Sequence, residues 1–171
     1  MRAFVWYWPM VLAGVGTAMY LLSPLKPDVF GINGLFHGLS QVLIVLPGFY
    51  IAALAAVASL SNSGLDEDLG SDAPSVTMEI RDKSVPVTLT RRKFLLLAIA
   101  YVSVLSLLLL VTGVVLAYGF DPNTMAAIFP MIVLLGLNTL TLAVFLYFFA
   151  SLISTTVHIV YFLAEGAHLP V

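Results

Sequence analysis

The chain has 171 residues, of which 61% are hydrophobic and 9% are charged. Soluble domains average roughly 45–50% apolar and about 25% charged residues, so this composition excludes a water-exposed globular protein. The formal net charge is -2 and there is no cysteine, which excludes disulfides, thiolate catalysis and Cys-ligated metals.

Four apolar stretches are long enough to cross a bilayer, whose hydrocarbon core of about 30 Å requires roughly 20 helical residues. They run from Phe4 to Leu22, from Leu35 to Leu60, from Phe94 to Tyr118, and from Met125 to about Leu163. Arg2 before the first stretch also fits a cleaved signal peptide, but no A-x-A-like site follows, which favours a retained span. We therefore predict four transmembrane helices.

The second stretch carries small residues at four-residue spacing. Gly48, Ala52 and Ala56 form a small-residue stripe, and such stripes let helix backbones approach closely in lipid. We expect these residues to pack against a helix, either within the chain, which base rates favour, or between copies. Pro47 predicts a kink in this helix, with Ser40 as one group that would satisfy the freed carbonyl.

The seven basic and nine acidic residues are concentrated in one segment. Eleven of them lie between Ser61 and Lys93, the central charged segment (61–93). Its first part, Ser61 to Pro74, mixes acidic residues with Gly and Ser and predicts a flexible linker. Apolar and polar residues then alternate on both sides of a polar turn at Asp82–Ser84, which predicts a β-hairpin. The alternating apolar residues are Val76, Met78 and Ile80, then Val85, Val87 and Leu89.

An isolated hairpin is marginally stable and its edges invite pairing. We expect it either to be completed by another copy or a partner protein, or to lie against its own helix ends, and the sequence favours neither. The basic run Arg91 to Lys93 also suits anionic lipid headgroups. The predicted partner-binding residues are Met78, Ile80, Arg81, Lys83, Val85, Val87, Arg91 and Arg92.

The fourth stretch is about forty residues, near 60 Å if helical throughout. Either Pro130 breaks it or its last turns project into the cytoplasm. Because Lys and Arg cluster in the central charged segment and Arg2 precedes the first span, the positive-inside rule places that segment and both termini in the cytoplasm.

The predicted fold class is therefore an all-α integral membrane protein with four transmembrane helices and a small cytoplasmic β-hairpin between the second and third. We divide the chain into residues 1–60 with the first two spans, residues 61–93 with the acidic linker and hairpin, and residues 94–171 with the last two spans and a cytoplasmic tail.

Polar residues inside the predicted spans are the remaining candidates for function. They either line a wet path or act as a sensor, or they form hydrogen bonds between helices, and we favour the latter because unpartnered burial is costly. The group comprises His37, Ser40, Gln41, Asn138, Thr139 and Thr141.

The sequence contains few residues in the arrangements that catalysis requires. His37, His158 and His168 are too far apart for a metal set of ordinary spacing, and no nucleophile elbow, paired intramembrane carboxylates or phosphate-binding loop is present. We predict no catalytic, cofactor-binding or metal-binding residues and no enzyme activity. Two functions remain: a membrane sensor and anchor that recruits a soluble effector, and an oligomeric channel or small transporter component.

Two segments resemble a known family. Leu46 to Ala58 reads LPGFYIAALAAVA and Val85 to Leu95 reads VPVTLTRRKFL, and both are similar to the transmembrane subunit of the bacterial Kiwa anti-phage defence system. The resemblance implies a homo-oligomer, a tetramer, in the bacterial inner membrane that senses infection and works with a cytoplasmic DNA-binding partner. It implies neither catalytic residues nor direct nucleic-acid binding by this chain.

Overall fold

The structure is a computed structural model that describes residues 2–23, 28–60, 63–66, 75–80 and 83–167. Within these residues there are seven helices and two strands. In chain order they are α1 (Arg2–Leu22), α2 (Leu35–Leu43), α3 (Leu46–Ser59), α4 (Ser63–Asp66), β1 (Ser75–Ile80), β2 (Lys83–Thr88), α5 (Arg91–Gly119), α6 (Pro122–Ile128) and α7 (Met131–Ala167).

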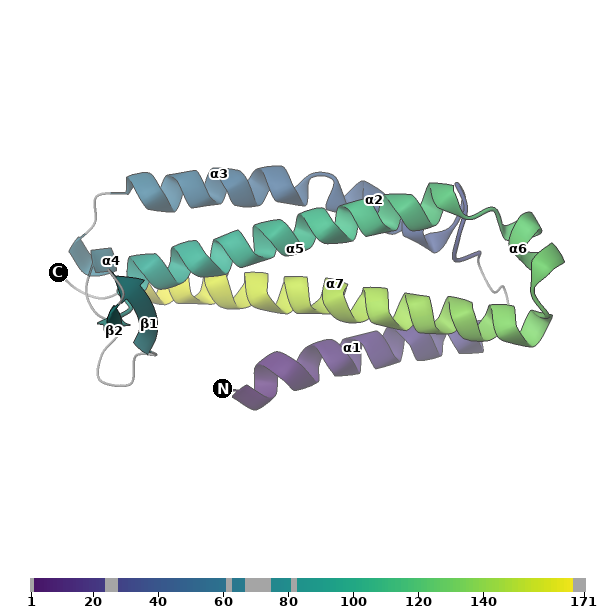
Figure 1. The fold of residues 1–171 in the computed structure, drawn as a ribbon, viewed down its shortest axis with the longest axis horizontal. Helices are drawn as coiled ribbons and strands as arrows, with labels where there is room; N and C mark the ends of the chain where they lie inside the picture. The colour runs from purple at the N-terminus through teal and green to yellow at the C-terminus, as the bar shows by residue number, and fades with distance from the viewer. Residues whose placement is uncertain (1, 24–27, 61–62, 67–74, 81–82, 168–171) are drawn as a thin grey trace.

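The long helices lie side by side in the order α2 and α3, α5, α7 and α1 (Figure 1). α5 packs against α2 and α3 on one side and against α7 on the other, and α1 packs against α7. The strands, α4 and the start of α5 are at one end of the molecule, and α6 is at the opposite end (Figure 1). We refer to these as the charged end and the α6 end.

Three of these helical segments, rather than the predicted four, are long and apolar enough to cross a bilayer within the described residues. They are Leu35–Ser59, Arg91–Gly119 and Met131–Leu163. Helix α1 contributes a shorter apolar segment, Tyr7–Leu22, among the residues whose side chains the structure describes. Figure 1 shows α1 beginning short of the charged end. The chain is compatible with a membrane protein, and the predicted fold class is corrected: within the described residues three helical segments, not four, qualify as candidate spans.

This correction also removes the basis for one prediction. Placing both termini on the same side of the membrane assumed an even number of spans. Three candidate spans among the described residues do not establish an even number of passes, so the side on which each terminus lies stays a prediction.

The second span is interrupted between α2 and α3. Ile44 and Val45 separate the two helices while keeping right-handed helical dihedral angles. Pro47 is the second residue of α3, and proline both lacks the N–H that would bond the carbonyl of Leu43 and clashes with that carbonyl. The predicted kink is confirmed. Ser40 does not donate to the carbonyl of Leu43, because its hydroxyl donates to Phe36 O at 2.7 Å instead.

Pro130 separates α6 from α7. The fourth apolar stretch is therefore broken at this proline, which is one of the two arrangements expected from the sequence. α7 nevertheless keeps 37 residues, about 55 Å of helix. Its length therefore exceeds the hydrocarbon core even after the break, and the candidate span within it is Met131–Leu163.

An aromatic cluster ties the α6 end together. Phe36 of α2 is packed edge-on against Phe145 of α7 with ring centroids 5.0 Å apart, and against Phe30 at 5.6 Å. Phe30 also lies 5.6 Å from Phe120, just after α5. The cluster holds the α1–α2 connection against three helices, so this end is fixed by packing of apolar rings.

Helices α2 and α5 approach closely at Gly113. A Cβ added to Gly113 would lie 2.6 Å from the Ser40 hydroxyl oxygen and 3.4 Å from the ring of Phe145. Both Ser40 and Gly113 are buried, so only the missing side chain of Gly113 lets α2, α5 and α7 meet here.

β1 and β2 form a two-stranded antiparallel sheet. Cα partners include Val76 with Val87 and Met78 with Val85. The predicted turn is misplaced, because Lys83 and Ser84 belong to β2 and pair with Ile80 and Glu79. The connection therefore falls at residues 81–82, which lie outside the described residues. The second strand begins two residues earlier than the polar pattern suggested.

Candidate functional site

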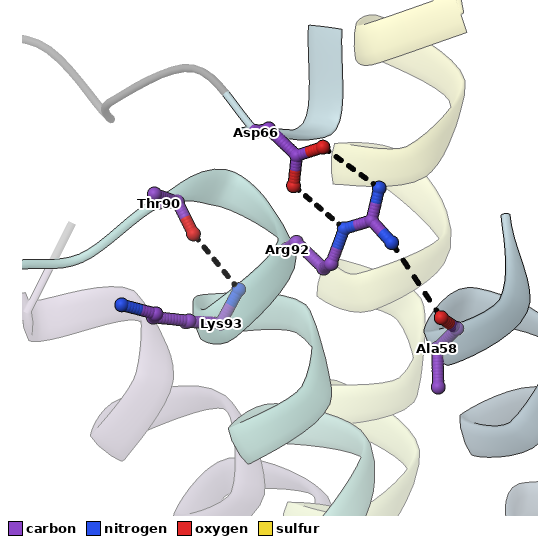
Figure 2. Close-up of polar contacts among 5 residues, drawn as sticks. All are labelled: Ala58, Asp66, Thr90, Arg92 and Lys93. Carbon is purple, nitrogen blue, oxygen red and sulfur yellow. Dashed lines mark hydrogen bonds and ion pairs between the residues drawn. The ribbon is translucent and has the colours of Figure 1, made fainter. Parts of the chain in front are cut away.

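Arg92 joins three helices at the charged end. Its Nε lies 2.8 Å from Asp66 Oδ1 and its second guanidinium nitrogen donates to Asp66 Oδ2 at 3.0 Å. The remaining nitrogen donates to Ala58 O at 3.5 Å, near the end of α3. Figure 2 shows the guanidinium between the two acceptors. We call Ala58, Asp66 and Arg92 the Arg92 junction. The pair thus combines one charge-assisted hydrogen bond, to Asp66 Oδ2, with a close ion-pair contact between Nε and Oδ1.

The first turn of α5 carries three consecutive cations. Arg91, Arg92 and Lys93 begin the helix, and its first turn contains no acidic residue. The Thr90 hydroxyl accepts from Lys93 N at 3.4 Å and caps the helix. Because the N-terminus of a helix carries a partial positive charge, each cation here is unfavourable by roughly 0.3–1 kcal/mol. Local propensity therefore does not explain this basic run.

Only one of these cations is paired with an acid among the described residues. Asp66 is taken by Arg92, and the side chain of Lys93 points away from that pair (Figure 2). Arg91 is half-buried and Lys93 is exposed. Within the described residues, the start of α5 therefore carries more positive charge than Asp66 neutralises.

The other predicted docking residues are on the sheet. Met78 and Val85 are register partners, as are Ile80 and Lys83, and Val87 pairs with Val76. The side chains of these residues, and Arg81 entirely, lie outside the described part of the chain. The register brings the predicted residues of both strands together along the backbone, whereas Arg91 and Arg92 belong to α5 rather than to the sheet.

The small-residue stripe does not pack within the chain, which was the arrangement that base rates favoured. Gly48, Ala52 and Ala56 are all exposed, and a Cβ added to Gly48 would meet nothing within 4 Å. The face of α3 that is buried carries Tyr50 and Val57 instead. The stripe is consequently open to lipid or to another chain.

Hydroxyls inside the spans mostly bond to their own helix, not to neighbouring helices as predicted. Ser40 donates to Phe36 O and Thr139 to Leu135 O, each at 2.7 Å. Ser103 donates to Ile99 O at 2.8 Å. Bonds to the carbonyl four residues earlier satisfy a hydroxyl locally, so these groups supply little of the wet lining that a conducting path needs.

Polar contacts within the described spans also cross between helices, as predicted for His37 and Asn138. The Asn138 side chain is hydrogen-bonded to the Tyr20 hydroxyl and links α7 to α1. The Tyr50 hydroxyl and Thr156 Oγ1 are 2.7 Å apart and link α3 to α7. The Tyr118 hydroxyl lies 3.3 Å from His37 Nδ1 and links α5 to α2 near the α6 end. The sequence gives no signal that Thr156 meets Tyr50, because their register depends on how far α3 and α7 are shifted along one another.

The α6 end has a smaller polar cavity of about 310 Å³, whose lining includes Asp28, Asn33 and Asp121. Asp121 is the N-cap of α6 and accepts from the Thr124 hydroxyl at 2.7 Å and the Thr124 amide at 3.1 Å. These donors hold the pKa of Asp121 below its ordinary value. Its carboxylate therefore caps the N-terminus of α6. Within the described residues, no three His, Asp or Glu side chains come together as a metal site.

Comparisons with protein families, curated proteins and solved structures found no match to this chain. Function has to be inferred from the residues and their geometry.

Proposed function

We propose that the chain is a membrane-embedded anchor that assembles with copies of itself and recruits a soluble protein at its charged end. The observation that carries this proposal is the basic first turn of α5. Arg91, Arg92 and Lys93 stand where the helix dipole disfavours cations, and Asp66 neutralises one of them. A sequence that departs from local preference at one position often does so for function.

The Arg92 junction supports docking because it makes the site rigid. Arg92 fixes α4 and the end of α3 against the start of α5, so an incoming partner meets a preformed surface and loses less entropy on binding. Arg92 itself is occupied, so Arg91 and Lys93 are the cations offered to a partner with an acidic surface. This revises the predicted docking set, in which Arg92 was a direct contact.

The resemblance to the Kiwa transmembrane subunit fits this proposal. It supplies a chemical identity for the partner, a cytoplasmic DNA-binding protein, and a role for the assembly in sensing phage at the inner membrane. The exposed small-residue stripe supports assembly, because small residues are enriched where membrane helices approach closely.

An oligomeric channel is the alternative. It is disfavoured because no Asp, Glu, Lys or Arg lies between Phe94 and Gly119 or between Met131 and Leu163, and because Ser40, Ser103 and Thr139 are satisfied by their own helices. A cation or anion path normally needs charged or carbonyl-lined rings.

The test is co-expression with the soluble protein encoded by the neighbouring reading frame. We expect Arg91→Glu with Lys93→Glu to reduce its capture on the purified chain at least tenfold, while Lys26→Glu, a charge change elsewhere in the sequence, leaves capture unchanged. Equal capture by the double variant would contradict docking at α5 and leave the basic run to lipid headgroups. Met78→Asp with Val87→Asp tests the sheet residues separately.

A further inference from the structure

A membrane-depth groove between α5 and α7 contains two hydroxyls without partners. The cavity is about 530 Å³ and its lining is apolar except for Thr112 of α5 and Thr141 of α7. Unlike Thr139, which donates to Leu135 O, neither hydroxyl makes a hydrogen bond within the described residues. An unpartnered hydroxyl in lipid is costly, so the occupant of this groove should bring a polar group to that depth.

Gln41 is the matching group elsewhere on the same chain. It is exposed on α2 and its amide has no partner within the described residues. An amide offers both donors and an acceptor, which is what two hydroxyls on facing helices can use. Gln41 therefore has the same unsatisfied chemistry as the groove, on a surface that a second copy can present.

The depths of the two groups agree. Ser40 and Gly113 touch, since a Cβ on Gly113 would be 2.6 Å from the Ser40 hydroxyl oxygen. Gln41 and Thr112 are their immediate neighbours, so the two differ in depth by on the order of one residue rise, 1.5 Å. Identical chains take the same orientation in a membrane. Gln41 of one copy therefore lies at about the same depth as Thr112 of the next copy.

The side of the helix that carries Gln41 also carries small residues, which allow it to enter a groove. Gln41 lies seven residues before Gly48, which places both on one side of a helix, and the dihedral angles at Ile44 and Val45 keep the path helical between them. Gly48 and Ala52 are exposed and small. The small-residue stripe therefore continues the surface of Gln41 toward the charged end.

We propose that the α2–α3 face of one copy seats in the α5–α7 groove of the next, with the Gln41 amide bonded to the Thr112 and Thr141 hydroxyls. The proposal rests on the assembly put forward above and names its interface. The two surfaces are different, so the contact is heterologous and repeats around a closed ring rather than forming an isolated two-fold pair.

Cross-linking tests this contact directly because the chain has no cysteine of its own. Two differently tagged populations are co-expressed, one with Gln41→Cys and the other with Thr112→Cys, and oxidised in the membrane. We expect a disulfide between the two tags at least tenfold more abundant than disulfides between like tags. The matched control replaces Thr112→Cys by Val111→Cys, an exposed α5 residue outside the groove lining.

Dominant Gln41 to Gln41 links, equal linking of Val111, or no link between the tags would overturn the proposed interface. A native mass separates this failure from that of the proposed function: an oligomer with the wrong links leaves assembly standing, whereas a monomer overturns both.

A second measurement does not depend on introduced thiols. Thr112→Val with Thr141→Val should weaken self-association about threefold to fifteenfold, as expected for interhelical hydrogen bonds in membranes. Thr139→Val, whose hydroxyl is satisfied within α7, should leave it unchanged. Equal effects of the two variants would overturn the role of the groove hydroxyls.

Discussion

Gly113 lies on α5 directly opposite Ser40 of α2. Because an added Cβ would be 2.6 Å from the Ser40 hydroxyl oxygen, we expect Gly113→Ala to destabilise the chain by about 1–3 kcal/mol, the usual cost of overpacking. Thermal unfolding in detergent measures the change. Ser40→Ala in the same chain removes the clashing oxygen and should recover most of the loss.

Gly136 provides the control for this substitution. It is on α7, and a Cβ there would meet nothing within 4 Å. Gly136→Ala should be neutral or slightly stabilising, because alanine is the better helix former. If both glycine variants lose equal stability, close packing at Gly113 is not the cause.

Asp121 gives a pH-dependent prediction. Thr124 donors lower its pKa in the folded chain, so the contribution of this cap is complete above the ordinary Asp value of about 3.9 and is lost as pH falls through the lower folded value. The Thr124 amide resonance should titrate with a midpoint below about 3.9. Asp121→Asn should abolish that titration while keeping the cap. A midpoint at or above the ordinary value would contradict the assignment.

At the scale of elements, the Arg92 junction should couple α4 to α5. Its guanidinium side chain is 20% exposed and the Asp66 side chain 63%, so solvent screens the pair and a double-mutant cycle of Arg92→Ala and Asp66→Ala should give a coupling of about 0.2–1 kcal/mol. Arg92→Lys should lose part of it, because ammonium cannot make both contacts with the carboxylate. Additive single effects would show that the two side chains do not interact in solution.

The hydrogen bond between Tyr50 and Thr156 is the polar link from α3 to α7. Tyr50→Phe should cost about 0.6 kcal/mol, the average for such bonds in membranes. Tyr101→Phe is the control, since that hydroxyl is exposed and has no partner within the described residues. An equal loss in both variants would assign the effect to the ring environment.

Part of this architecture could be predicted from the sequence. Apolar runs of about 20 residues mark the spans, and Pro47 marks the kink, because both act through neighbouring residues. The contact of Ser40 with Gly113 and the pairing of Arg92 with Asp66 could not be predicted, since each depends on how two separate helices are aligned. Whether the small-residue stripe packs within the chain or against another chain could not be predicted either, because the residue spacing is the same in both cases.

For the whole molecule, the helices form a row rather than a closed bundle. α1 packs against α7 and α3 against α5, so apolar faces such as those carrying Gly48 and Ala52 stay open. A row has two surfaces of different shape, which is what a heterologous assembly requires. In the proposed assembly, each chain would contribute one Arg91 and one Lys93 at the charged end, and the proposed recruitment would gain from multivalency.

Native mass spectrometry of the chain, released from membranes with its soluble neighbour co-expressed, tests the central claim most directly. An anchor that assembles and recruits predicts a species containing several 18.4 kDa chains together with the soluble protein. A single chain of 18.4 kDa with nothing bound would contradict both assembly and recruitment.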